Sequence, residues 1–98
     1  MTRVRLDATV RGVVQGVGFR VFVLDAAAGL AVSGWVANER AGALRCVAEG
    51  DRADLEALVR ILERGPAGSI VESVSTVWMP TTGTFDDFSI RSTWHSGD

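Results

Sequence analysis

The sequence has 98 residues and a formal net charge of −2, and all ten of its basic residues are arginines. This length predicts one domain whose core needs no metal or disulfide to fold, and the slightly acidic balance argues against bulk nucleic-acid binding. The absence of lysine excludes lysine nucleophiles, while one cysteine and one histidine cannot build a structural zinc site. No apolar run approaches the roughly 20 residues that cross a membrane, and the N-terminus lacks an apolar signal core. We therefore expect a cytoplasmic protein that binds no membrane.

The first third of the chain predicts a strand, a glycine-rich loop and a helix. Residues 4–10 alternate between apolar and polar side chains, which indicates a strand with one buried and one wet face. The three glycines of residues 12–20 interrupt any regular element. The pattern over about residues 20–30 is typical of a helix, with Gly29 near its end. One apolar face of this helix is expected to carry Val21, Leu24 and Ala28, with Phe22 nearby.

The rest of the chain predicts two strands, a second helix and two more strands. Short strands over residues 33–38 and 43–49 are expected to form a hairpin. A helix is predicted over about residues 52–64 and a β-branched strand over 70–79. A last short strand is expected over residues 85–91.

The predicted second helix has clear boundaries. Asp51 is placed to cap its N-terminus, and Gly65 with Pro66 ends it. Such a helix is too short to persist alone, so its stability must come from packing an apolar stripe on a sheet. The stripe at helical spacing consists of Leu55, Leu58, Val59 and Leu62.

The order of these elements predicts an α+β fold. It is β-α-β-β-α-β plus a short extra strand, which is the order of a ferredoxin-like split β-α-β sandwich with two helices on one face of an antiparallel sheet. We expect a single domain over residues 1–93 and a frayed tail over residues 94–98. Because this fold serves enzymes, ligand sensors and RNA binders alike, the function has to be inferred from a site.

The glycine-rich loop is the strongest candidate for a site. It leads from a strand into a helix N-terminus, where unpaired main-chain N–H groups and the helix dipole favour an anion. Gly16 and Gly18 can adopt a positive φ, and Arg20 follows with a planar guanidinium that matches two phosphate or carboxylate oxygens. The standard nucleotide-binding patterns do not fit this loop. The residues alone therefore leave two interpretations open, an oxyanion cradle and an ordinary glycine-rich turn beside a surface arginine.

Two stretches of the sequence resemble the signatures of the acylphosphatase family. Residues 10–20 read Val-Arg-Gly-Val-Val-Gln-Gly-Val-Gly-Phe-Arg and are similar to the first signature. Residues 33–38 read Ser-Gly-Trp-Val-Ala-Asn and are similar to the second. Further similarity at residues 47–50, 64–66 and 83–91 keeps the same order. The resemblance thus covers nearly the whole chain.

The resemblance implies an acylphosphatase, which hydrolyses a small-molecule acyl phosphate to a carboxylate and inorganic phosphate. It implies no metal, no cofactor and no covalent phosphoenzyme, and we expect a monomer. The Arg20 side chain would hold the phosphoryl group, and the Asn38 side chain would orient the attacking water. The main-chain N–H groups that would cradle the phosphoryl group belong to Gln15, Gly16, Val17, Gly18, Phe19 and Arg20.

The implied mechanism suits these residue types. An acyl phosphate has a good carboxylate leaving group, so the transfer depends mainly on positioning and on stabilising charge. Asn38 cannot act as a base at neutral pH, so the phosphate itself is the expected proton acceptor. One residue departs from the family, because Glu39 stands where a small hydroxyl residue is common. We expect its carboxylate to face solvent and to pair with a neighbour such as Arg40.

Two other classes of function stay open. One is a non-catalytic ferredoxin-like module that binds an acyl phosphate or another small anion. The other is an accessory domain that handles carbamoyl phosphate, as similar domains do within longer chains in hydrogenase maturation. The length of 98 residues favours the enzyme, because nothing else in the sequence could perform a downstream transfer.

Other reactive residues have simpler interpretations. Cys46 and Arg52 have the C-x5-R spacing of tyrosine phosphatases, but two acidic residues lie between them and Cys46 shares its parity with apolar strand positions. His95 lies in the predicted tail, and the turn residues Asp86 and Asp87 are expected to be solvated. These residues predict neither a nucleophile nor a metal site.

The tryptophans and the remaining arginines are also given structural roles. Trp35 and Trp78 are expected to pack in the core or across strands, and neither belongs to a pattern for stacking bases. Nine of the ten arginines are interpreted as solvated surface residues, and Arg20 is the exception. The solvated group includes three residues of the first strand, Arg3, Arg5 and Arg11.

Overall fold

A computed structural model describes residues 2–92 of the chain. The predicted tail over residues 94–98, with Trp94 and His95, lies outside this range. The elements follow the chain as β1 (Arg3–Val13), α1 (Phe19–Ala27), β2 (Val32–Asn38), β3 (Leu44–Asp51), α2 (Arg52–Arg64), β4 (Ile70–Pro80) and β5 (Phe88–Ile90). None of the helices described is long and apolar enough to cross a membrane.

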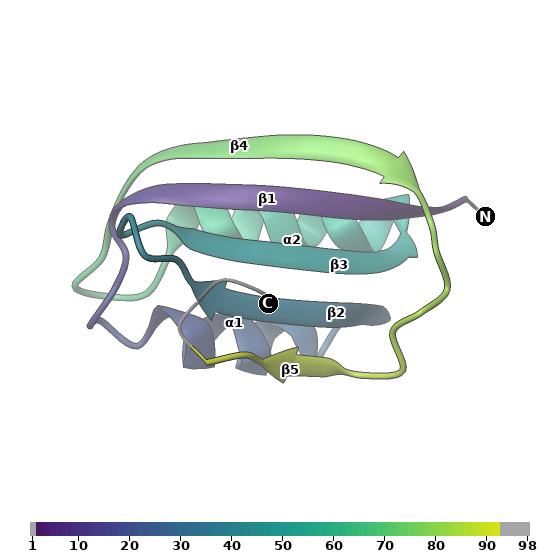
Figure 1. Ribbon diagram of the computed structural model, residues 1–98, viewed down its shortest axis with the longest axis horizontal. Helices are drawn as coiled ribbons and strands as arrows, with labels where there is room; N and C mark the ends of the chain where they lie inside the picture. The colour runs from purple at the N-terminus through teal and green to yellow at the C-terminus, as the bar shows by residue number, and fades with distance from the viewer. Residues whose placement is uncertain (1, 93–98) are drawn as a thin grey trace.

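The five strands form one sheet in the order β4-β1-β3-β2-β5. Figure 1 shows both helices on the same side of this sheet, with α2 behind β1 and β3 and with α1 behind β2 and β5. This arrangement confirms the ferredoxin-like α+β fold that the order of elements predicts. In the part of the chain that the structure describes, the other face of the sheet carries no helix.

The pairing of the strands refines that prediction. β1 pairs antiparallel with β3 and β4, and β2 pairs antiparallel with β3. β5 pairs parallel with β2, so the sheet is mixed rather than purely antiparallel. β5 spans only Phe88–Ile90, because the predicted range 85–91 includes turn residues ahead of the strand.

The alternation in β1 separates a core face from a wet face. Leu6, Ala8 and Val10 are fully buried beneath the helices, together with residues of β3. The pairing with β4 shifts register between Arg11 and Gly12, which is a β-bulge just ahead of the glycine-rich loop. A side chain at Gly12 would collide with the Ile70 carbonyl, since an added Cβ would lie 2.0 Å from that oxygen. The end of β1 therefore enters the loop through a bend that requires glycine.

The sequence predicts the buried face of α2 correctly but not that of α1. α2 has the predicted bounds and buries Leu55, Leu58 and Leu62, although the side chain of Asp51 at its N-cap makes no capping hydrogen bond. In α1 the predicted apolar face is wrong. This helix buries Phe19, Val23 and Ala27, while Val21 is 55% exposed. Residues 21–24 are all apolar, so no polar side chain marks the outer face, and the burial of Phe19 decides how the helix is rotated.

A buried carboxylate lies at the end of the sheet opposite the glycine-rich loop. Glu49 on β3 is 1% exposed, and its carboxylate accepts hydrogen bonds from the loop between β4 and β5. Burial alone would raise the pKa of Glu49, but hydrogen bonds from Thr81, Thr82 and Gly83 outweigh that effect and lower the pKa to about 2. This carboxylate therefore stays ionised and holds the β4–β5 loop on the sheet.

The expectation that nine arginines are only solvated is wrong for several of them. Arg5 lies 3.5 Å from the Glu49 carboxylate, and Arg45 forms a two-pronged ion pair with Asp7. Other guanidinium groups lie over aromatic rings, which adds cation–π attraction. These pairs are Arg5 with Phe85, Arg45 and Arg91 with Trp35, and Arg52 with Trp78.

Candidate active site

A small cavity opens where the glycine-rich loop, the start of α1 and the end of β2 meet. Its volume is about 90 Å³, which leaves room for several water molecules or a small anion. Arg20 and Asn38, which are separated by 18 positions in the sequence, both line it. Within residues 2–92 the lining consists of Val14, Gly16, Gly18, Phe19, Arg20, Val21 and Asn38.

Two glycines give the loop its shape. Gly16 has φ 74° and Gly18 has φ 77°, values in the left-handed region that favours glycine. An added Cβ on either glycine would meet no atom within 4 Å, so the space beside them is open. Successive left-handed and right-handed residues turn main-chain N–H groups toward one side and form a nest for an anion. The loop therefore presents backbone to the cavity without side chains in the way.

The N-terminus of α1 adds unpaired donors to the same cavity. The first helical hydrogen bond runs from the Phe22 N–H to the Gly18 carbonyl at 3.1 Å. The N–H groups of Phe19, Arg20 and Val21 precede it and have no acceptor within the helix. No side chain caps this end, because the N-cap position is Gly18. The helix dipole and these donors together favour a negative charge in the cavity.

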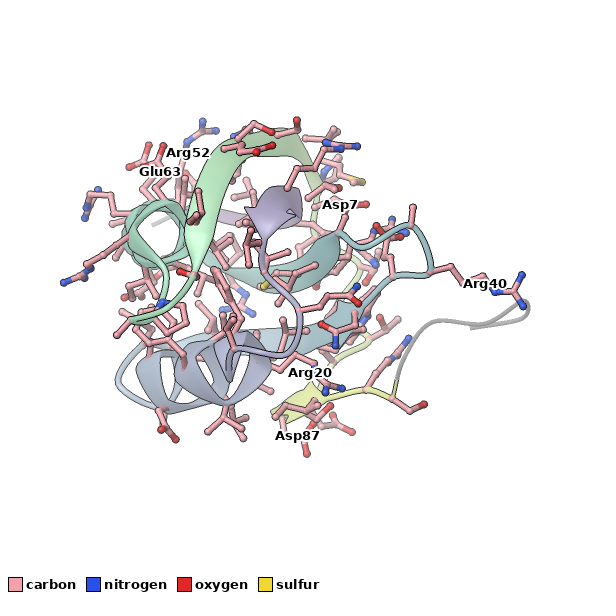
Figure 2. All side chains as sticks on the ribbon, turned by 90° about the vertical axis from the view of Figure 1, so that its left-hand side faces the viewer. Asp7, Arg20, Arg40, Arg52, Glu63 and Asp87 are labelled. Carbon is pink, nitrogen blue, oxygen red and sulfur yellow. The ribbon has the colours of Figure 1, made fainter. Side chains whose placement is uncertain are left out.

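The Arg20 side chain supplies a full positive charge at this point. It is half-buried at the cavity, and within residues 2–92 no ion pair or hydrogen bond engages its guanidinium. Figure 2 shows Arg20 beside the start of α1, whereas Arg40 extends away from it at the turn between β2 and β3. The five N–H donors of Arg20 are therefore available to an anionic ligand.

Asn38 contributes a polar atom of a different kind. It ends β2 on the helix-covered face, where it pairs with Leu44 of β3, and it is 8% exposed. Its Oδ1 atom is buried, and across residues 2–92 no other buried side-chain oxygen or nitrogen lacks a hydrogen-bond partner. Buried polar atoms are normally paired, so such an atom in a cavity calls for a ligand or a water.

The Gln15 side chain holds the loop against the end of β2, whereas the sequence predicts a role only for the Gln15 main-chain N–H. Its Nε2 donates to the Glu39 carbonyl at 2.7 Å and to the Ala43 carbonyl at 3.0 Å. Neither Gln15 nor Val17 lines the cavity, and Val17 packs partly buried against the core. No local pattern reveals a side chain whose partners lie 24 and 28 residues away.

A family model described as Acylphosphatase matches residues 6–90. The chain belongs to the acylphosphatase family. It is 41% identical over 90 residues to an acylphosphatase from Salinibacter ruber, which covers 92% of this chain and 95% of that one. It is an enzyme that hydrolyses the bond between carboxyl and phosphate in small-molecule acyl phosphates.

Solved structures of acylphosphatases show the same fold. The crystal structure of an acylphosphatase from Bacillus subtilis superimposes with a TM-score of 0.86 at 33% identity, over 90% of this chain and 98% of that chain. A structure of full-length HypF in its phosphate- and nucleotide-bound form has a TM-score of 0.86 at 28% identity. The similarity to HypF covers 98% of this chain and 13% of the much longer HypF chain.

Glu39, where this chain departs from the usual acylphosphatase pattern, does not line the cavity. It is half-buried and borders a separate hollow of about 270 Å³ together with Arg11. The pKa of Arg45 is raised chiefly by its hydrogen bond to Asp7, and the charge of Glu39 adds to this effect. The inward orientation that would repel a phosphate is therefore absent, whereas the pairing of Glu39 with Arg40 stays a prediction.

The other reactive residues lie apart from the cavity that Arg20 and Asn38 line. Cys46 is fully buried in β3, and burial together with the charge of Asp7 raises its pKa to about 12, so its thiol is protonated and inaccessible. This confirms that Cys46 is a buried hydrophobic residue. Asp86 and Asp87 are exposed as expected. No group of three acidic, cysteine or histidine side chains in the described part of the chain could hold a metal ion.

Proposed function

We propose that the cavity binds the phosphoryl group of the acyl phosphate and that Asn38 positions the water that attacks it. The observation that carries this proposal is the buried Oδ1 of Asn38, which has no hydrogen-bond partner although it lines the same cavity as Arg20. A water molecule that donates to this oxygen would lie beside a bound phosphorus atom. The proposal assigns a role to each group of the cavity.

The main-chain N–H groups of residues 15–20 and the Arg20 guanidinium bind the phosphoryl oxygens. Negative charge on the equatorial oxygens has to be stabilised as the transfer proceeds, and preorganised donors do this without reorganising at the moment of reaction. The open space beside Gly16 and Gly18 lets these oxygens approach the backbone closely. Arg20 offers two parallel donors to two oxygens, which fixes the orientation of the group.

Asn38 orients the nucleophile and does not remove its proton, because an amide is neutral and non-basic at neutral pH. The water oxygen attacks phosphorus, the bond between phosphorus and the acyl oxygen breaks, and the carboxylate leaves with the bonding electron pair. The proton of the water passes to a phosphoryl oxygen. The carboxylate is a good leaving group, so no general acid is required, and the rate depends on positioning.

We also propose that the enzyme works as a cytoplasmic monomer that binds no nucleic acid. A single chain brings Arg20, Asn38 and the glycine-rich loop together at one cavity, which supports a site within one subunit. The free thiol Cys46 suits a reducing compartment. Sedimentation equilibrium at the concentration of the activity assay tests the monomer, and a dimeric mass would contradict it.

The assay that tests the proposed roles is hydrolysis of benzoyl phosphate by the wild type, Arg20→Ala and Asn38→Ala. Each variant is expected to lose at least about 100-fold in kcat/KM while its circular dichroism stays that of the wild type. Arg60→Ala, an exposed arginine of α2, is the matched control and should retain wild-type activity. A folded Arg20→Ala or Asn38→Ala variant with near-wild-type kcat/KM would show that the roles are assigned wrongly.

The carbamoyl phosphate alternative can be separated in the same assay. This fold also occurs as a small part of a much longer chain, since the match to HypF covers 13% of that chain. An accessory domain that handles carbamoyl phosphate is therefore the alternative to test. Benzoyl, acetyl and carbamoyl phosphate are compared at equal concentrations. A kcat/KM that is highest for carbamoyl phosphate would favour the alternative, and the reverse order favours a general acylphosphatase.

A further inference from the structure

The Gln15 side chain joins two parts of the site that are far apart in the sequence. Its Nε2 donates to the Glu39 carbonyl at 2.7 Å and to the Ala43 carbonyl at 3.0 Å. Both acceptors are carbonyl oxygens, so only the NH2 end of the amide can make these two bonds. The contact is partly buried and uses both N–H groups of that end.

The two carbonyls belong to the turn that follows Asn38. The Glu39 N–H donates to the Ala43 carbonyl at 2.8 Å, and the Gly42 N–H donates to the Glu39 carbonyl at 3.1 Å. Gln15 therefore adds a second hydrogen bond to each carbonyl and fixes the turn from the side of the loop. Asn38 directly precedes this turn, so a shift of the turn relative to the loop also shifts the Asn38 side chain.

The loop has few other contacts that could fix it at this position. Gly16 and Gly18 have no side chains, and nothing lies within 4 Å of where a Cβ would stand. Val14 and Phe19 anchor the two ends of the loop in the core. Between these anchors, Val17 packs partly buried against the core, and among the described residues the Gln15 side chain makes the polar contact that ties the loop to the end of β2.

We propose that Gln15 is a positioning residue that sets the distance between the phosphate-binding loop and the water held by Asn38. This inference rests on the proposed function of the cavity. The main-chain donors of the loop and Arg20 keep their own geometry when the Gln15 side chain is changed, so binding of phosphate is retained. What changes is the position of the attacking water relative to phosphorus. A misplacement of about 1 Å can lower the rate on the order of 100-fold.

Gln15→Met is the first test, because methionine has a similar length and no donor. Each carbonyl keeps its main-chain hydrogen bond in this variant, so the turn still forms. We expect kcat for benzoyl phosphate to fall about 10- to 100-fold, while the inhibition constant of inorganic phosphate stays within about twofold. Gln15→Glu should lose at least as much, since a carboxylate cannot donate to two carbonyls. Thr82→Val, which removes a side-chain hydrogen bond at the far end of the sheet, is the control for stability and should keep wild-type kcat.

A double-mutant cycle with Asn38→Ala shows whether Gln15 acts through Asn38. If it does, Gln15→Met lowers kcat by less than about threefold once Asn38 is already alanine. A loss as large as in the wild-type background would overturn the inference, as would a wild-type kcat in Gln15→Met or a phosphate inhibition constant that rises with the loss of kcat. If Asn38→Ala alone leaves kcat unchanged, the proposed function fails and this inference falls with it, which distinguishes the two failures.

Discussion

The Thr82 hydroxyl donates a hydrogen bond to the buried Glu49 carboxylate at 2.7 Å, which fastens the β4–β5 loop to the middle strand of the sheet. The main-chain N–H groups of Thr82 and Gly83 each donate to the same carboxylate at 2.9 Å. β4 and β5 form opposite edges of the sheet, so the loop between them has to cross its end (Figure 1). One side chain of β3 therefore holds the crossing in place.

Glu49→Gln should destabilise the fold. The amide of the variant places an NH2 group where the neighbouring donors already point. Hydrogen bonds to a charged acceptor also stabilise more than those to a neutral one. The expected loss in the free energy of unfolding is about 2–3 kcal/mol. Urea denaturation measures it. Glu56→Gln, an exposed glutamate of α2 paired with Arg52 at 3.5 Å, is the control and should cost less than about 0.5 kcal/mol. Equal losses in the two variants would contradict the role of Glu49.

The same carboxylate makes stability depend on pH in the acid range. The pKa of Glu49 is lowered to about 2 in the folded chain, whereas a glutamate in an unfolded chain has a pKa of about 4.3. The contribution of the Glu49 carboxylate to the free energy of unfolding is therefore complete above about pH 5 and is lost as the pH falls toward about 2. The free energy of unfolding of the wild type should drop over this window more steeply than that of Glu49→Gln. Parallel curves for the two proteins would show that Glu49 titrates normally.

Arg20→Lys should fail although it keeps the charge. An ammonium is a point charge and cannot offer the two parallel donors of a guanidinium, so we expect kcat/KM for benzoyl phosphate to fall about 100-fold. The inhibition constant of inorganic phosphate should rise in the same variant. A lysine variant with more than about half of the wild-type kcat/KM would mean that charge alone suffices at this position.

The pH–rate profile should be flat between about pH 5 and 8, because the proposed mechanism uses no protein base. Among the described residues that line the cavity, Arg20 alone carries an ionisable side chain, and the Cys46 thiol with its pKa of about 12 is buried elsewhere. The measurement is kcat/KM for benzoyl phosphate across this range. A limb that titrates near pH 6.5 or 8.5 would contradict it by revealing a histidine or a cysteine in the reaction.

Glu39→Thr should change kcat/KM by less than about threefold. The Glu39 side chain does not line the cavity, and the carbonyl that Gln15 contacts belongs to its main chain. Parallel assays of the wild type and the variant on benzoyl phosphate measure the effect. A gain of tenfold or more would show that the carboxylate reaches the dianionic ligand.

Much of the fold could be predicted from the sequence because its strands and second helix have strong periodicity. The alternation in β1 fits only one choice of buried face, and the apolar spacing in α2 fits only one rotation of the helix. Both predictions agree with the structure. α1 has no polar residue among positions 21–24, so its rotation depends on how Phe19 fits between the sheet and the helix. The parallel edge formed by β5 depends on a loop path, which a local pattern does not contain.

The site shows the same division between local and distant effects. A glycine-rich loop that leads into a helix is a candidate anion site, because its donors are fixed by local geometry, although the residues alone leave an ordinary turn equally open. The contacts of Gln15 and Glu49 could not be predicted, since each joins segments more than 20 residues apart. Charged residues on a wet strand face can look solvated in a sequence and still find partners, as Arg5 and Arg45 do.

The burial of Cys46 makes its thiol a built-in probe of structural opening. Thiol reagents react with an accessible thiolate. In the folded state the pKa of about 12 keeps the Cys46 thiol protonated, and complete burial keeps reagents away from it. The Cys46 side chain lies in the core between the sheet and the helices, so its thiol reaches solvent only when the helices separate from the sheet. The rate of labelling at this single native cysteine therefore measures how often the core opens, with no probe or substitution added to the protein.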